Sequence, residues 1–266
     1  MSTTQSPTAT STLTVTPTLV PTVPSDVTAQ SVEQLQAALA DRYGATSANE
    51  RPPRSRARWP IFGLVAAVTG FLSSALTFPS ETTREEQRSG VAVISKLERG
   101  HYHAAFILGL VSIGALLVTA AGWRRWAEAR APRDLAARTI GHGFAVVATV
   151  NVVFTALLGT MALYLPGGMD HGTIGPDQMF VNWSLLDFGN LLGWWGAVVA
   201  AICVATISLR RNRILPRWMG VVSVLFALPP IAYAVATGLP GFPGLTMPVW
   251  LAVMSIGMIA SRRAEA

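Results

Sequence analysis

Long apolar stretches alternate with short polar or basic segments between residues 59 and 263. Each stretch has about 17 to 28 residues, enough for a helix to cross a hydrocarbon core of about 30 Å. Turn residues or charges separate the stretches from one another. The pattern therefore predicts an all-α, polytopic transmembrane helix bundle with six spans, at residues 59–79, 101–123, 140–165, 182–209, 218–239 and 245–261.

The composition excludes a soluble globular domain. Hydrophobic residues make up 51% of the chain and charged residues only 13%, against about a quarter in an average soluble domain, and the mean hydropathy is +0.43. The chain has one cysteine, Cys203, so it cannot form an internal disulfide, a CxxC redox pair or a cysteine zinc site of its own.

Residues 1–58 differ from the rest of the chain. Thr, Ser and Pro are dense there, and the segment has too little apolar surface to offset the entropy of ordering. We expect a disordered cytoplasmic tail without the apolar core of a signal peptide. Within it, Ser31 and Gln34 fit a capping box, which predicts a short amphipathic helix at 31–43. That helix is either transient or a docking element for a cytoplasmic partner or the membrane surface.

The basic residues orient the spans. Fifteen of them flank the side that holds both chain ends, and four lie in the first loop of the opposite side. Because the positive-inside rule places the basic side in the cytoplasm, both termini are predicted to be cytoplasmic. Nineteen of the twenty basic residues are Arg, a bias typical of a GC-rich bacterial genome, so we expect the bacterial cell membrane. The basic residues flank apolar blocks instead of clustering on a soluble surface, which argues against a nucleic-acid partner.

Two span features bear on packing. A stripe of small residues in the fourth stretch lets another backbone approach closely in lipid, either within the chain or in a homo-oligomer; it consists of Gly189, Gly193, Ala197 and Ala201. Pro229 and Pro230 lie near the middle of the fifth stretch and predict a kink there. Five tryptophans lie at span ends, where the headgroup zone favours an amphipathic ring: Trp59, Trp123, Trp126, Trp183 and Trp218.

Polar residues toward the predicted outer face form the candidate polar site. Imidazole and carboxylate together can bind a divalent metal or relay protons. However, His101 and His103 are two residues apart, so they point about 200° apart on a helix. The uncharged stretch after Asp187 is long enough to leave this acid near the interface. We therefore assign no metal, cofactor or catalytic residue, and keep six candidates. Asn151 is the deepest amide, near the middle of the third stretch, and the others lie toward the predicted outer face: His101, His103, His171, Asp187 and Asn190.

The stretch from about Val91 to Arg263 resembles a family of uncharacterised six-helix bacterial membrane proteins. The matching features are an outer helix that runs into His101 and an Ala-rich span, an Ala/Arg-rich inner loop to Arg138, and the segment 215–220 (LPRWMG). The resemblance implies the six-span fold and lends no activity or cofactor.

Two functions remain open. The favoured one is a non-enzymatic integral membrane protein that serves interaction or membrane organisation, because each polar feature has an adequate structural explanation. The alternative is a small-solute or ion permease that uses the Asp187 and Asn190 face together with the Pro229–Pro230 break. The chain has no phosphate loop, HExxH, GxSxG elbow or Rossmann glycine pattern, so an enzyme has little motif support.

Overall fold

The computed structural model describes residues 34, 58–77, 90–211, 213–239 and 242–264, without the side chains of 187, 188, 190, 191 and 262–264. Residues 56–266 form one compact unit. The predicted helix at 31–43 lies outside the described residues, apart from Gln34, which is helical.

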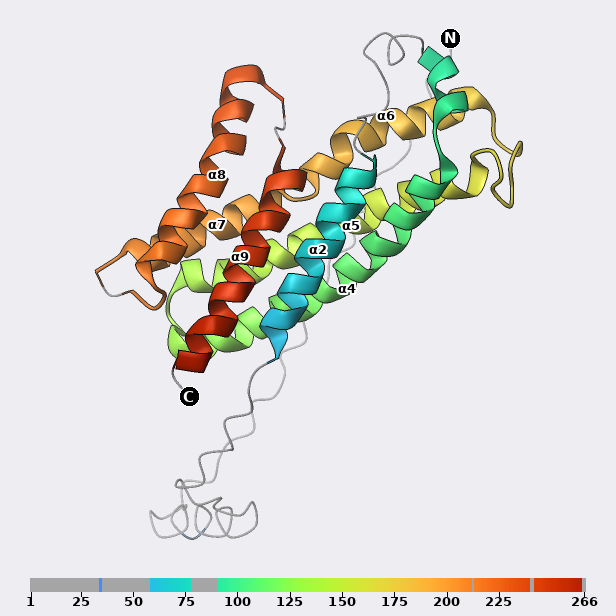
Figure 1. Cartoon of the computed structure of the whole chain (residues 1–266). Helices are drawn as coiled ribbons and strands as arrows, with labels where there is room; N and C mark the ends of the chain where they lie inside the picture. Colours follow the sequence, from blue (N-terminus) through green and yellow to red (C-terminus); the bar gives the residue numbers. More distant parts are fainter. Residues whose placement is uncertain (1–33, 35–57, 78–89, 212, 240–241, 265–266) are drawn as a thin grey trace, which may run out of the picture. The chain divides into compact units, whose positions relative to one another are not determined.

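The described part of the chain contains helices joined by loops, and no strands (Figure 1). Five helices are long and apolar enough to cross a membrane: α2, α4, α5, α8 and α9. In order, the elements are α2 (Trp59–Thr77), the 3-10 helix η1 (Gly90–Lys96), α4 (Arg99–Arg130), α5 (Leu135–Tyr164), α6 (Pro176–Leu192), α7 (Trp195–Leu209), α8 (Arg217–Thr237) and α9 (Pro243–Ala264).

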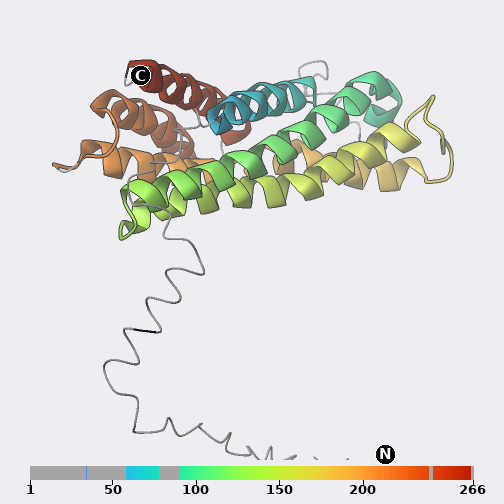
Figure 2. The same cartoon turned by 90° about the horizontal axis from the view of Figure 1, so that it is seen from below.

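The helices pack as an antiparallel bundle (Figures 1 and 2). Helix α2 packs between α9 and α4, α5 packs between α4 and α7, and α8 packs on α7 and contacts α9. The start of α2 and the end of α9 lie at the same end of the unit, since Gly63 faces Ser255 and Thr119. The sequence predicts that this end faces the cytoplasm, and we call it the inner end.

In α2, bulky apolar residues lie on the outside of the bundle and small residues lie inside. In α2 the buried residues are Pro60, Gly, Ala and Ser, while Ile61, Phe62, Val65 and Val68 are 37–50% exposed. In water such an arrangement would expose the most hydrophobic face. In a bilayer it is the expected one, because lipid contacts the bulky chains and small residues allow helices to approach.

Helices α5 and α7 approach each other closely at Gly143 and Gly196. A Cβ atom on either glycine would lie 2.5 Å from the backbone oxygen of the other. The small-residue stripe of the fourth stretch is also buried within the chain: Gly189 faces the ring of Phe154, and Ala197 and Ala201 are fully buried. The stripe therefore packs intramolecularly, and a homo-oligomer through Gly189, Gly193 and Ala197 would have to displace Phe154.

Aromatic rings gather at the inner end. The ring of Trp123 contacts those of Trp59, Trp126 and Phe144 at centroid distances of 5.7, 5.1 and 6.4 Å, and Phe144 contacts Trp250. Trp123 and Trp126, like Trp183 elsewhere, are less than 9% exposed. The end-of-span tryptophans thus pack mostly against protein, and only Trp218, at 44% exposure, has the open ring expected at an interface.

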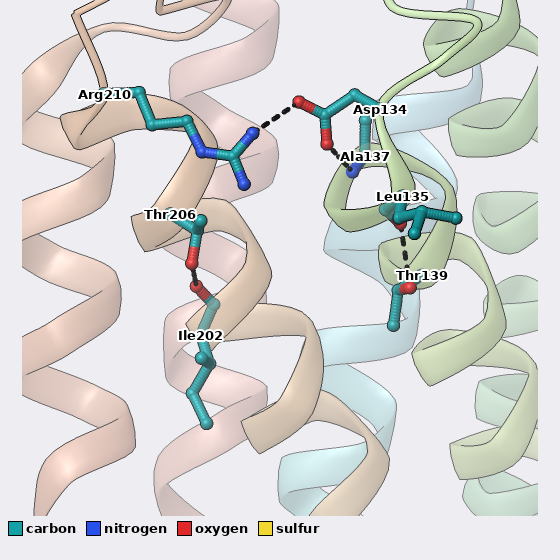
Figure 3. A network of polar contacts seen from close by, with 7 residues as sticks. All are labelled: Asp134, Leu135, Ala137, Thr139, Ile202, Thr206 and Arg210. Carbon is teal, nitrogen blue, oxygen red and sulfur yellow. Dashed lines mark hydrogen bonds and ion pairs between the residues drawn. The ribbon is translucent and has the colours of Figure 1, made fainter.

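An ion pair ties two inner loops together (Figure 3). Asp134 caps α5 by accepting a hydrogen bond from the Ala137 N–H at 3.1 Å, and its other oxygen accepts one from Arg210 at 2.8 Å. The carboxylate therefore stabilises the start of α5 and holds it to the end of α7.

The fourth stretch differs locally from expectation, and the kink expected in the fifth stays a prediction. The fourth is interrupted between α6 and α7, at Gly193 and Trp194, where the sequence suggested one continuous helix. By contrast, α8 continues as a helix through Pro229 and Pro230. Helix α9 begins at Pro243 and contains Pro248 in its interior, so the last helix is longer than residues 245–261.

Replacing Gly143 by Ala tests the α5–α7 approach. The added Cβ meets backbone that cannot rotate away, so we expect Gly143→Ala to lower the free energy of unfolding by about 1–3 kcal/mol. Gly114→Ala is the control, because a Cβ there meets nothing within 4 Å, and it should be neutral or slightly stabilising. Thermal unfolding in detergent measures both. Equal melting temperatures for the two variants would contradict the close approach.

Candidate functional site

The three outer histidines lie apart from any ligand cluster. His101, next to the start of α4, lies 3.6 Å from Glu98, and His103 is exposed. The Nδ1 atom of His171 lies 3.2 Å from the backbone oxygen of Tyr164. Among the described residues, no group of three or more His, Cys, Asp or Glu is placed to hold a metal ion.

Asp187 and Asn190 lie on α6, just before the helix interruption. Their side chains lie outside the described part of the structure, so their role as a polar face stays a prediction. The backbone of α6 places both within two turns of Trp194.

The interruption is a short, local departure from α-helix. The Gly193 N–H still donates to the Gly189 oxygen at 3.0 Å, whereas the Ala197 N–H donates to the Trp194 oxygen only three residues back, at 2.9 Å. Trp194 has φ −93° and ψ 3°, outside the usual α-helical values. As a result, its indole ring lies against Gly70 of α2, where a Cβ atom would clash with the ring.

A small polar cavity lies where this interruption meets three other helices. It leaves about 10 Å³ for the centre of a water molecule, about the minimum for one water. Helix α2 contributes Gly70, Ser73 and Ser74, α4 contributes Gly109 and Ser112, α5 contributes Asn151 and Thr155, and Trp194 comes from the interruption.

Two of the serines tie α2 to α4 at the cavity wall. The Ser73 hydroxyl donates to the Ala105 oxygen of α4 at 2.8 Å, and the Ser112 hydroxyl donates to the Ala66 oxygen of α2 at 3.0 Å. Such interhelical hydrogen bonds hold helices together in lipid. Ser74 differs, because its Oγ atom is buried and has no hydrogen-bond partner.

The cavity has the chemistry of a neutral hydrogen-bonding site. Its eight described lining residues include three serines, one threonine and one asparagine, and none is ionisable. Hydroxyl and amide groups can each donate and accept hydrogen bonds. The arrangement therefore suits water or a small uncharged polar solute better than a transition-metal ion, which favours imidazole or thiolate ligands.

Among the sequence-predicted candidates whose side chains the structure describes, only Asn151 belongs to this cavity. The other lining residues were missed because Gly, Ser and Thr are ordinary packing residues in membrane helices. Their spacing along the chain is the signal that could have identified them. Gly70 precedes Ser73 and Ser74, Gly109 precedes Ser112, and Asn151 precedes Thr155, each by three or four residues, which places each set on one helix face.

A second cavity lies toward the inner end and is almost entirely apolar. It leaves about 20 Å³ for the centre of a water molecule. Its walls include the aromatic residues Trp59, Trp123, Phe144 and Trp250 and the methionines Met219, Met254 and Met258. Apolar cavities of this kind stay dry, so the two cavities differ in the ligands they can hold.

Comparisons with protein-family models, with curated proteins and with solved structures find no match. The resemblance to uncharacterised six-helix membrane proteins therefore stays a prediction.

Trp194 is expected to support the site's structure. Its ring is 1% exposed, and truncation of a buried Trp typically costs about 3–5 kcal/mol. We expect Trp194→Ala to lower the melting temperature strongly, and Trp218→Ala, at a ring that is 44% exposed, to lower it much less. Thermal unfolding followed by size-exclusion chromatography measures the difference. A larger loss for Trp218→Ala would contradict the packing of Trp194 at the interruption.

Proposed function

We propose that this chain is an integral membrane protein of six spans, with both termini in the cytoplasm of a bacterial cell. The five long apolar helices supply five spans, and α6 with α7 supplies the remaining one. Support for a single crossing comes from their contacts along α5. Asn182 donates to the Leu157 oxygen, Gly189 faces Phe154, and Gly196 faces Gly143, so the two helices follow α5 in one antiparallel direction.

The proposed activity is that of a small-solute permease with its binding site in the polar cavity. One observation carries this proposal: the interruption of a crossing helix coincides with a cavity lined by hydroxyl and amide groups from three other helices. Interrupted helices at mid-membrane are a recurrent way to build a substrate site in transporters. The site differs from the sequence-based version in position, because the interruption is at Trp194 and not at Pro229–Pro230.

The chemistry of the cavity favours a small, uncharged solute, and a solute larger than water enters only if the helices move apart, since the cavity has about the volume of one water. Three serines, one threonine and one asparagine line the cavity without an ionisable group among the described residues, so a charged solute would lack a counter-charge there. Asp187, within two turns of the interruption, is proposed as a polar residue on the outer approach. Residues 1–58 stay a candidate binding segment for a cytoplasmic partner.

Cysteine accessibility tests the topology. In a Cys203→Ala background, we expect Thr173→Cys, between α5 and α6, to react with a membrane-impermeant maleimide in intact cells. Arg133→Cys, between α4 and α5, and Arg213→Cys, between α7 and α8, should react only after permeabilisation. All three positions are exposed in the structure. Equal labelling of Thr173→Cys and Arg213→Cys in intact cells would overturn the crossing by α6 and α7.

Solute flux tests the activity. We expect proteoliposomes containing the protein to take up urea or glycerol faster than empty liposomes in stopped-flow light scattering. Thr155→Val removes a cavity hydroxyl with little change of shape, so it should reduce the flux several-fold. Thr149→Val is the matched control, because Thr149 lies on the exposed face of the same helix.

Asp187→Asn separates the outer approach from the cavity in the same assay. Reduced flux in Asp187→Asn but not in Thr155→Val would indicate that the solute binds at the Asp187 face and not in the polar cavity. Flux equal to that of empty liposomes for every variant would contradict the permease and favour the non-enzymatic interaction protein.

A further inference from the structure

Among the described residues, two buried hydroxyl groups have no hydrogen-bond partner, and their surroundings differ. Ser74 is 2% exposed and Ser208 is 0% exposed, and neither Oγ atom is paired. Ser74 lines the polar cavity. Ser208 lines neither of the two cavities and lies against Gly220 of α8, where its Cβ atom is 2.8 Å from the position of an added Cβ.

An unpaired hydroxyl inside a membrane protein is unfavourable, because neither lipid nor packed side chains can replace the hydrogen bonds of water. Ser74 therefore needs a partner, and the cavity beside it has about the volume that one water needs. The walls offer more than one further hydrogen bond. Ser73 and Ser112 use their hydrogens on backbone oxygens, which leaves their oxygens able to accept.

We propose that the polar cavity binds one ordered water molecule, hydrogen-bonded to the Ser74 hydroxyl and to polar groups of Asn151, Thr155 or Ser112. A buried water typically makes about three hydrogen bonds to groups that otherwise lack partners, and these residues come from α2, α4 and α5. The water thus joins three helices at the interruption of the fourth crossing. This site requires no transport activity, so it stands whether or not the permease assay succeeds.

The sign of the Ser74→Ala effect tests the proposal. If a water is bound, the variant loses one of its hydrogen bonds and the melting temperature falls, by roughly 2–4 °C. If the cavity is dry, the variant removes an unpaired buried hydroxyl and the melting temperature rises. Ser208→Ala is the control, since its hydroxyl is equally buried and lines neither of the two cavities, and its melting temperature should rise.

Radiolytic labelling in water enriched in oxygen-18 tests occupancy directly, with the purified full-length protein in lipid nanodiscs. A bound water beside a buried ring supplies hydroxyl radicals locally. We expect label on Trp194, which is 1% exposed and lines the polar cavity, to exceed several-fold the label on Trp250, which is 0% exposed and lines the apolar one. Ser74→Ala should reduce the Trp194 label.

Two results would overturn the water site. One is a melting temperature that rises in Ser74→Ala as it does in Ser208→Ala. The other is label on Trp194 no greater than that on Trp250, because both rings are equally shielded from bulk solvent.

Discussion

Close approach of helix backbones is the constraint on which the rest of this structure depends. In lipid the surroundings are as apolar as the side chains, so helices associate through packing and interhelical hydrogen bonds instead of through burial of apolar area. Gly143 and Gly196 meet that requirement most directly, since each lies against the backbone oxygen of the other. The crossing of α5 and α7 then determines where α6 and α8 lie on the bundle.

The same constraint explains why polar groups collect at the middle of the bundle. Serine and threonine are small enough for a close interface, and their hydroxyls can bond to a backbone oxygen of the neighbouring helix. Ser73 and Ser112 do this in opposite directions between α2 and α4. Where the chain departs from helix at Trp194, the ring packs on Gly70 and leaves a gap beside Ser74. A hydrogen-bonding cavity is the result.

The inner end is held in a different way. Aromatic rings around Trp123 fill the space between helices, and the Trp123 N–H donates to the Ala137 oxygen at the start of α5. Asp134 joins that start to Arg210 at the end of α7 (Figure 3). The inner end is thus bound by large rings and an ion pair near water, whereas the middle is bound by small residues and hydroxyls.

Hydropathy and length alone determined the helical class and the approximate position of each apolar helix, because a hydrocarbon core requires long apolar segments whatever their packing. Tertiary contacts decided the rest. The helix is interrupted at Gly193–Trp194 and not at Pro229–Pro230. Trp194 packs on Gly70 at the interruption, whereas α8 stays helical through both prolines. Asn151 was recognisable as a deep amide, but Ser74 and Thr155 became site residues only when three helices brought them to one cavity. Spacing along one helix cannot specify which faces of different helices meet.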